Sequence, residues 1–195
     1  MGRYGIGFQQ GSKLQSYCRS QSPTQPKSAP IWDYSKKDDP LRGISLDQFV
    51  LGGKYLTPPS LLTKDPTLVV QCSSGKFKTA YFDAGAVVQR GSYQSALKGT
   101  LAHVDIRFDE KKPTVDSWEI SNDGQGLFFD STQLTRLLTG RMLGHPGDAE
   151  ALVHRVILGV VEAFGNQIVI EFDMPQEADR MVTACGLEWG RRKKK

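Results

Sequence analysis

The segment at residues 101–108 alternates between two sets of side chains, and this pattern constrains the fold more than any other feature of the chain. One set is Leu101, His103, Asp105 and Arg107, and the other is Ala102, Val104, Ile106 and Phe108. A period of two residues is typical of a strand that has one face in the core and one face toward solvent. We therefore predict a half-buried strand whose second set faces the core.

Three further pairs of segments have the composition of antiparallel hairpins. Residues 67–72 and 77–88 flank a Ser-Ser-Gly turn, and residues 118–120 and 127–129 flank an Asx-Gly turn at 121–124. Residues 152–163 and 168–172 flank Phe164-Gly165-Asn166. A helix over 152–163 is the alternative, because its apolar residues also fit a 3.6-residue period, but their β-branched content favours a strand.

Two short helices are expected. The first begins at Asp130 or Ser131 as N-cap, has Gln133 in the capping-box position and ends at Gly140. The second is predicted to begin around Asp173, with an early proline at 175, and to end at Gly186. These elements predict an α+β, mainly β fold, with an antiparallel β-sandwich-like sheet and two short helices.

The chain has 195 residues, which suits one domain rather than two independent cores. Residues 1–30 are rich in Gly, Ser, Gln and Pro, so we expect a disordered leader or tether there. The single β-rich domain is expected over 31–189, with Trp32 and Tyr34 as core contacts at its entrance, and a basic tail over 190–195.

The formal charge of +4 does not indicate a nucleic-acid protein. Five of the 25 Lys and Arg residues stand at 191–195, which leaves 20 against 21 Asp and Glu in the rest of the chain. The body therefore lacks the positive surface that phosphate binding requires. No apolar run approaches the length of a membrane span, so no integral membrane segment is expected.

The residues offer little support for catalysis or for a metal site. His103, His145 and His154 have no partner at ligand spacing, and the Gly-Lys pairs at 53–54 and 75–76 lack the rest of a phosphate loop. We expect no enzyme, no cofactor and no metal. The alternative is a small-ligand binder or hydrolase that uses the 144–148 loop, with His145, Asp148 and Arg141 converging on a cleft.

Mixed charges follow the alternating segment, at Asp105, Arg107, Asp109, Glu110, Lys111 and Lys112. Alternating signs of this kind usually form a solvated face with weak ion pairs. A partner-binding edge is the alternative interpretation.

Cys72 and Cys185 each close an apolar run, and Cys18 lies in a polar segment. Two interpretations remain open: a disulfide between Cys72 and Cys185, or two reduced and buried thiols. Residues 1–21 lack the apolar region of a secretory signal. We therefore expect either a cytoplasmic protein with free thiols or an export signal upstream of Met1.

Several short motifs occur together in order: residues 66–72 (PTLVVQC), 104–109 (VDIRFD), 118–123 (WEISND), 127–129 (LFF), 172–173 (FD) and 184–186 (ACG). In this order they resemble small bacterial exported proteins, including the type VI secretion-associated VasI family. The resemblance covers about residues 32–189. It implies a β-rich periplasmic or envelope domain in which Cys72 and Cys185 form a structural disulfide, and no catalytic residues.

From the residues and the resemblance together, we expect a non-enzymatic exported or envelope accessory domain. Its partner would be an envelope protein, through an apolar patch or a sheet edge, with a possible role in type VI secretion.

Overall fold

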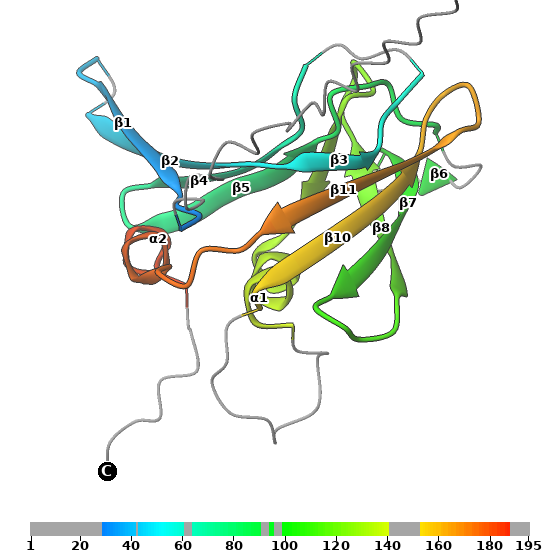
Figure 1. Cartoon of the computed structure of the whole chain (residues 1–195). Coiled ribbons are helices and arrows are strands. Elements are labelled where there is room, and N and C mark those ends of the chain that lie inside the picture. The colour runs from blue at the N-terminus through cyan, green and yellow to red at the C-terminus, as the bar shows by residue number, and fades with distance from the viewer. Residues whose placement is uncertain are drawn as a thin grey trace, which may run out of the picture.

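A computed structural model describes residues 29–41, 43–60, 64–90, 94–95, 99–140 and 153–187 (Figure 1). It confirms the mainly β fold with an antiparallel sheet and two short helices. The strands are β1 (Asp33–Asp39), β2 (Ile44–Gly52), β3 (Lys54–Thr57), β4 (Thr67–Ser73), β5 (Lys76–Asp83), β6 (Gln94–Ser95), β7 (Gly99–Phe108), β8 (Thr114–Ile120), β9 (Gly126–Phe129), β10 (Arg155–Val161) and β11 (Gln167–Asp173). The helices are α1 (Ser131–Thr139) and α2 (Asp179–Cys185).

The strands form one antiparallel sheet in the order β1-β2-β4-β5-β9-β8-β7-β10-β11-β3, with β6 paired to β7. Gly53 alone separates β2 from β3, although β2 pairs with β4 and β3 pairs with β11 on the other side of the sheet. The sheet therefore bends back on itself, and the β2–β3 segment connects its two halves.

The two halves face each other across one core. The ring of Phe82 on β5 lies 5.9 Å from that of Phe172 on β11 and 6.5 Å from that of Trp118 on β8, measured between centroids. These strands are not all neighbours in the sheet, so the contacts cross its interior. The core set expected in β7 is confirmed, because Ala102, Val104, Ile106 and Phe108 are all buried.

The hairpins predicted from turn residues are present. β4 pairs with β5, β8 with β9, and β10 with β11, all antiparallel. Residues 155–161 form a strand, so the helical alternative for this segment is wrong. The backbone of β10 pairs with β7 on one side and with β11 on the other, and its β-branched side chains suit a strand better than a helix.

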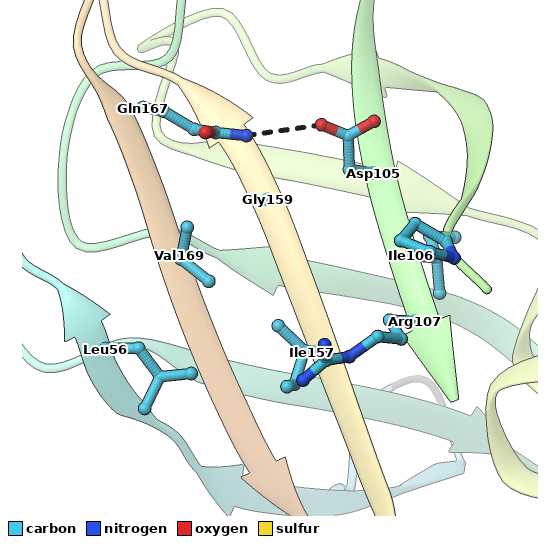
Figure 2. Close-up of a pocket in the computed structure, with 9 residues that line it drawn as sticks. Leu56, Asp105, Ile106, Arg107, Ile157, Gly159, Gln167 and Val169 are labelled. Carbon is cyan, nitrogen blue, oxygen red and sulfur yellow. Dashed lines mark hydrogen bonds between the residues drawn. The ribbon is translucent and has the colours of Figure 1, made fainter. Parts of the chain in front are cut away.

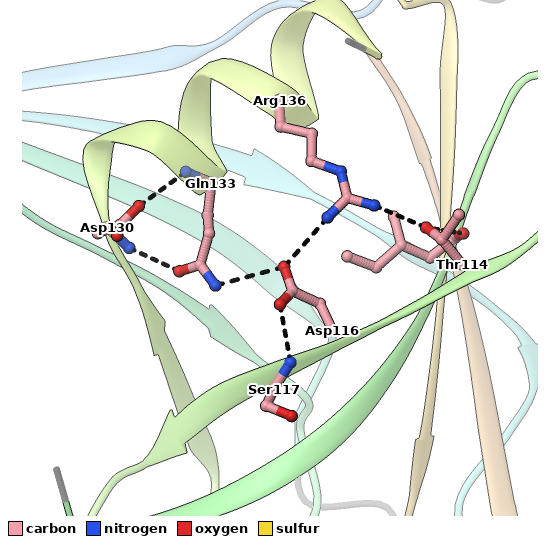
Figure 3. A network of polar contacts seen from close by, with 7 residues as sticks. Thr114, Asp116, Ser117, Asp130, Gln133 and Arg136 are labelled. Atoms are coloured by element: carbon pink, nitrogen blue, oxygen red, sulfur yellow. Dashed lines mark hydrogen bonds and ion pairs between the residues drawn. The ribbon is translucent and has the colours of Figure 1, made fainter. Parts of the chain in front are cut away.

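Helix α1 has the expected capping box. The side chain of Asp130 accepts a hydrogen bond from the backbone N–H of Gln133, and the Gln133 side chain accepts one from the N–H of Asp130 (Figure 3). Gly140 ends the helix in the left-handed region, with φ 63°. Leu134, Leu137 and Leu138 are buried, so α1 contributes its apolar side to the core.

A polar network joins α1 to β8 (Figure 3). The Arg136 guanidinium lies 3.4 Å from the Asp116 carboxylate and donates to the Thr114 hydroxyl at 2.7 Å. The Gln133 side-chain amide donates to the same carboxylate at 3.3 Å. Asp116 and Thr114 occupy core-facing positions of β8, and these partners from α1 satisfy them.

The predicted start of the second helix is wrong. Asp173 belongs to β11, where it pairs with Arg155, and the backbone N–H of Met174 extends this pairing to the carbonyl of His154. The Gln176 amide donates to the carbonyls of Val153 and Met174 instead of capping a helix. Helix α2 begins only at Asp179, and Gly186 ends it as expected.

The structure joins Cys72 on β4 to Cys185 at the end of α2 in a disulfide, with Cα atoms 4.9 Å apart. Both residues are buried in the core. The bond connects positions 113 residues apart and holds α2 against β4. This is the pairing that the resemblance implies, and it differs from the alternative of two separate buried thiols.

The hairpin β1–β2 projects from the sheet at its β4 side (Figure 1). Tyr34 on β1 packs against Phe49, donates to Asp47 at 2.7 Å and lies under the Arg180 guanidinium, 3.4 Å from the ring centroid. Trp32 and Tyr34 are partly buried against the core, in agreement with their expected role at the domain entrance. The cation–π contact also ties β1 to α2.

Candidate functional site

The residues proposed for the alternative hydrolytic site, Arg141, His145 and Asp148, lie outside the described residues, as do Cys18 and the basic tail at 190–195. His103 and His154 are exposed on separate segments of the described chain. Among the described residues, no group of three His, Cys, Asp or Glu side chains could hold a metal ion. Neither described helix has the length and apolar character needed to cross a membrane.

The charged residues at 105–112 divide into two groups. Asp109 accepts hydrogen bonds from the backbone N–H groups of His154 and Arg155, at 3.1 and 2.8 Å, and so holds the start of β10. Arg155 then forms ion pairs with Glu110 and with Glu171. These contacts are structural. Lys111 and Lys112 are exposed after β7, whereas Asp105 and Arg107 lie on β7 itself.

Asp105 and Arg107 line a groove on the outer face of β7, β10, β11 and β3, which we call the β10 groove (Figure 2). Its volume is about 340 Å³. Leu56, Ile157 and Val169 supply aliphatic surface from three different strands, and Leu56 is 47% exposed. The groove therefore combines an apolar floor with a small number of polar groups.

Gly159 has no side chain, and side chains from the two neighbouring strands, β7 and β11, meet over its position on the outer face of β10. The side-chain amide of Gln167 donates to the Asp105 carboxylate at 3.3 Å, across the position of Gly159 (Figure 2). A Cβ on Gly159 would lie 3.2 Å from the Asp105 Cβ and 3.4 Å from the Gln167 amide nitrogen. The glycine thus makes room for this hydrogen bond, which forms one end of the groove.

Arg107 forms the other polar part of the groove. Its side chain runs from β7 over β10 beside Ile157 (Figure 2). Its Nε is buried and has no hydrogen-bond partner, and no described acidic group forms an ion pair with it. A guanidinium has five N–H donors and stays charged, so this side chain can still bind an acceptor from outside the domain.

A second polar cluster surrounds Glu162, which is only 2% exposed. Its carboxylate accepts hydrogen bonds from the hydroxyl and the backbone N–H of Ser60, the latter at 3.0 Å, and from the Asn166 amide at 2.7 Å. The hydrogen bonds from Ser60 and Asn166 lower the pKa of Glu162, and they outweigh burial, which acts in the opposite direction. The cluster fastens the chain after β3 to the β10–β11 turn.

A third cluster centres on Tyr55, whose hydroxyl donates to the carbonyls of Ala84 and Lys64 at 2.7 and 3.1 Å. Burial, together with the negative charges of Asp65 and Asp83, raises the pKa of Tyr55 to about 12. The hydroxyl therefore stays protonated and acts as a structural donor. Lys64 in turn forms an ion pair with Asp83 at 2.6 Å.

The sequence placed Asp105 and Arg107 in a candidate partner-binding edge but gave no sign of the other residues of the groove. The groove is formed by Leu56 on β3, by β7 and by the β10–β11 hairpin, which lie far apart in the sequence, and their proximity follows from the strand order. Glu162 was also missed, because nothing around it in the sequence distinguishes it from an exposed turn residue.

The comparisons with known proteins add no relative. No protein-family model, no curated protein and no solved structure matches this chain.

Proposed function

We propose that this chain is a non-enzymatic accessory domain of the bacterial cell envelope and that it binds a protein partner through the β10 groove. The observation that carries the proposal is the aliphatic floor of the groove beside Arg107, whose guanidinium has no described ion pair. Exposed apolar surface rimmed by polar groups is typical of protein interaction sites.

The form of the groove favours a protein over a small molecule. It lies open on the outer face of a sheet, with lining residues from four strands. Small-molecule sites usually enclose most of their ligand. An open surface of this kind suits side chains that project from a segment of another protein.

The polar groups of the groove favour binding over catalysis. Asp105 is the carboxylate in its described lining, and it already accepts a hydrogen bond from Gln167. A nucleophile and a base within hydrogen-bond reach of each other are the usual sign of hydrolytic chemistry, and the lining side chains are not of those types.

The pairing of Cys72 with Cys185 supports a location outside the reducing cytosol, since disulfides persist mainly in oxidising compartments. The resemblance to type VI secretion-associated proteins of the VasI kind points to the same compartment. We therefore propose a periplasmic or envelope location, with type VI secretion as the associated process.

Photo-crosslinking in the native cells tests the binding function. A benzoylphenylalanine placed at Val169 should give one discrete crosslinked protein, and the same probe at Ser35 on β1 should not. Leu56→Asp should abolish the product, because it puts a charge into the apolar floor. Phe164→Asp, which changes an exposed apolar residue outside the groove, should leave it intact.

Two results would overturn the proposal. One is the same crosslinked products from Val169 and Ser35, and the other is no product from Val169. The location is tested separately by a non-reducing peptide map of protein from native cells. A Cys72–Cys185 crosslinked peptide is expected, whereas two free thiols would contradict an envelope location.

A further inference from the structure

We infer that the β10 groove recognises a partner segment that combines an aliphatic side chain with a carboxylate, and that Arg107 binds this carboxylate. The inference rests on the proposed binding function and specifies the chemistry of the partner. It follows from two observations. Arg107 lacks the partner that the other described arginines near packed surfaces have, and the two ends of the groove carry charges of opposite sign.

The other described arginines near packed surfaces have partners. Arg155 pairs with Glu110 and Glu171, Arg136 pairs with Asp116, and Arg180 lies over the ring of Tyr34. Arg107 differs from them, because no described acidic group or aromatic ring pairs with its guanidinium. A half-buried guanidinium without a described counter-ion is costly, so its position on a groove points to an anion that a partner supplies.

A carboxylate matches this donor best. The planar guanidinium can bind both carboxylate oxygens at once, and such charge-assisted hydrogen bonds are stronger than neutral ones. The side chain runs beside Ile157, so the bound carboxylate would lie next to the apolar floor (Figure 2). Partial exclusion of water there would strengthen the interaction further.

The aliphatic part of the partner has its own place. Leu56 and Val169 border the groove on the side of β3 and β11, and Leu56 remains about half exposed. A leucine or valine side chain from the partner would cover this surface and gain the free energy of apolar burial. The aliphatic side chain and the carboxylate must therefore belong to one short segment.

The opposite end of the groove gives the segment a direction. Asp105 carries a negative charge there and is hydrogen-bonded to Gln167. It would repel a second carboxylate and attract an N–H group or a basic side chain. The acidic residue of the partner should thus lie at the Arg107 end of the groove, with a donor at the Asp105 end.

Capped synthetic hexapeptides and the methyl NMR signals of the protein test this inference. Three peptides share alternating leucines and differ only in the residues between them, which are glutamate, glutamine or lysine. The glutamate peptide should shift the methyl signals of Leu56, Ile157 and Val169 and bind at least about tenfold more tightly than the glutamine peptide. The lysine peptide should bind most weakly.

Arg107→Gln should remove the preference for glutamate over glutamine, and Arg107→Lys should retain part of it. Lys36→Gln on β1, which also removes one exposed positive charge, is the matched control and should keep the full preference. Equal binding of the three peptides to the unmodified protein would overturn the inference, as would an absence of shifts with all three. The comparison among peptides does not depend on any variant folding correctly.

The two proposals fail in different ways. A crosslink specific to Val169 without a preference for glutamate would overturn the carboxylate inference and leave the binding function standing. Loss of the specific crosslink would overturn the binding function itself. A preference for glutamate that persists in Arg107→Gln would show that another cation binds the carboxylate and would contradict the role given to Arg107.

Discussion

Gly53 lies against the ring of Phe172 so closely that a Cβ atom on Gly53 would come within 2.7 Å of it, and within 2.9 Å of a methyl carbon of Ile170. Both neighbours are buried in the core on β11. Gly53 also connects β2 to β3, and its backbone N–H donates to the carbonyl of Pro66 at 2.8 Å. The bend that joins the two halves of the sheet therefore requires a residue without a side chain.

The first prediction concerns this bend. Gly53→Ala should lower the free energy of unfolding by about 1–3 kcal/mol, because the added methyl group overpacks the core. Gly52→Ala is the matched control, since a Cβ there meets nothing within 4 Å. Urea unfolding of both variants measures the difference. Equal midpoints for the two variants would show that a methyl group at position 53 fits beside Phe172 without overpacking the core.

The disulfide should make a large contribution to stability. The Cys72–Cys185 bond closes a loop of 113 residues, and the chain-entropy model gives roughly 4–5 kcal/mol for a loop of that size. Cys185→Ala should therefore unfold at a much lower urea concentration than the oxidised protein. Reduction of the unmodified protein should have a similar effect. A variant as stable as the oxidised protein would contradict the prediction.

The capping box at the start of α1 should contribute less to the free energy of unfolding than the disulfide does. Asp130→Ala removes the acceptor for the Gln133 N–H, and loss of such a cap typically costs about 1 kcal/mol. Thr132→Ala, at an exposed position in the same turn, should have little effect. Thermal unfolding of the two variants is the measurement. A loss for Asp130→Ala no larger than that for Thr132→Ala would contradict the role of the cap, since alanine is the better helix former at both positions.

The Glu162 cluster should make stability depend on pH. Hydrogen bonds from Ser60 and Asn166 hold the folded-state pKa of Glu162 below its unfolded value of 4.5. A lowered folded pKa means that the unfolded chain binds more protons, so this stabilisation is present above the unfolded pKa and is lost as pH falls through the folded pKa. The free energy of unfolding should decrease from about pH 5 toward pH 3.

Glu162→Gln tests this dependence, because the amide does not ionise. The variant should be less stable at neutral pH but should lose less stability on acidification than the unmodified protein. Asp123, whose pKa is also lowered, chiefly by its hydrogen bond from Ser121, should leave a residual dependence. Parallel losses in the two proteins between pH 5 and pH 3 would rule out a role for Glu162.

Several strands were not predicted from the sequence, and the reasons are physical. β1 has the sequence DYSKKDD, which carries little apolar alternation, and it is a strand because it pairs along its length with β2. β2 does contain a usable signal, since Phe49 and Leu51 are buried two residues apart. β3 has only four residues and follows from its pairing with β11.

The sequence by itself determined the elements whose signals are local. The alternation at 101–108 predicted the buried face of β7, turn residues predicted three hairpins, and the Asp130–Gln133 pair predicted the start of α1. In each case the interacting residues are close along the chain, so a short pattern is sufficient.

The tertiary structure alone decided the features that depend on strand order. Asp173 fits a helix N-cap locally, but its pairing with Arg155 extends β11 and delays α2 to Asp179. Likewise, the β10 groove exists because the bend at Gly53 brings β3 beside β11, which places Leu56 near Val169 and Arg107. Contacts between strands so distant in the sequence depend on the path of the whole chain, and no local pattern encodes that path.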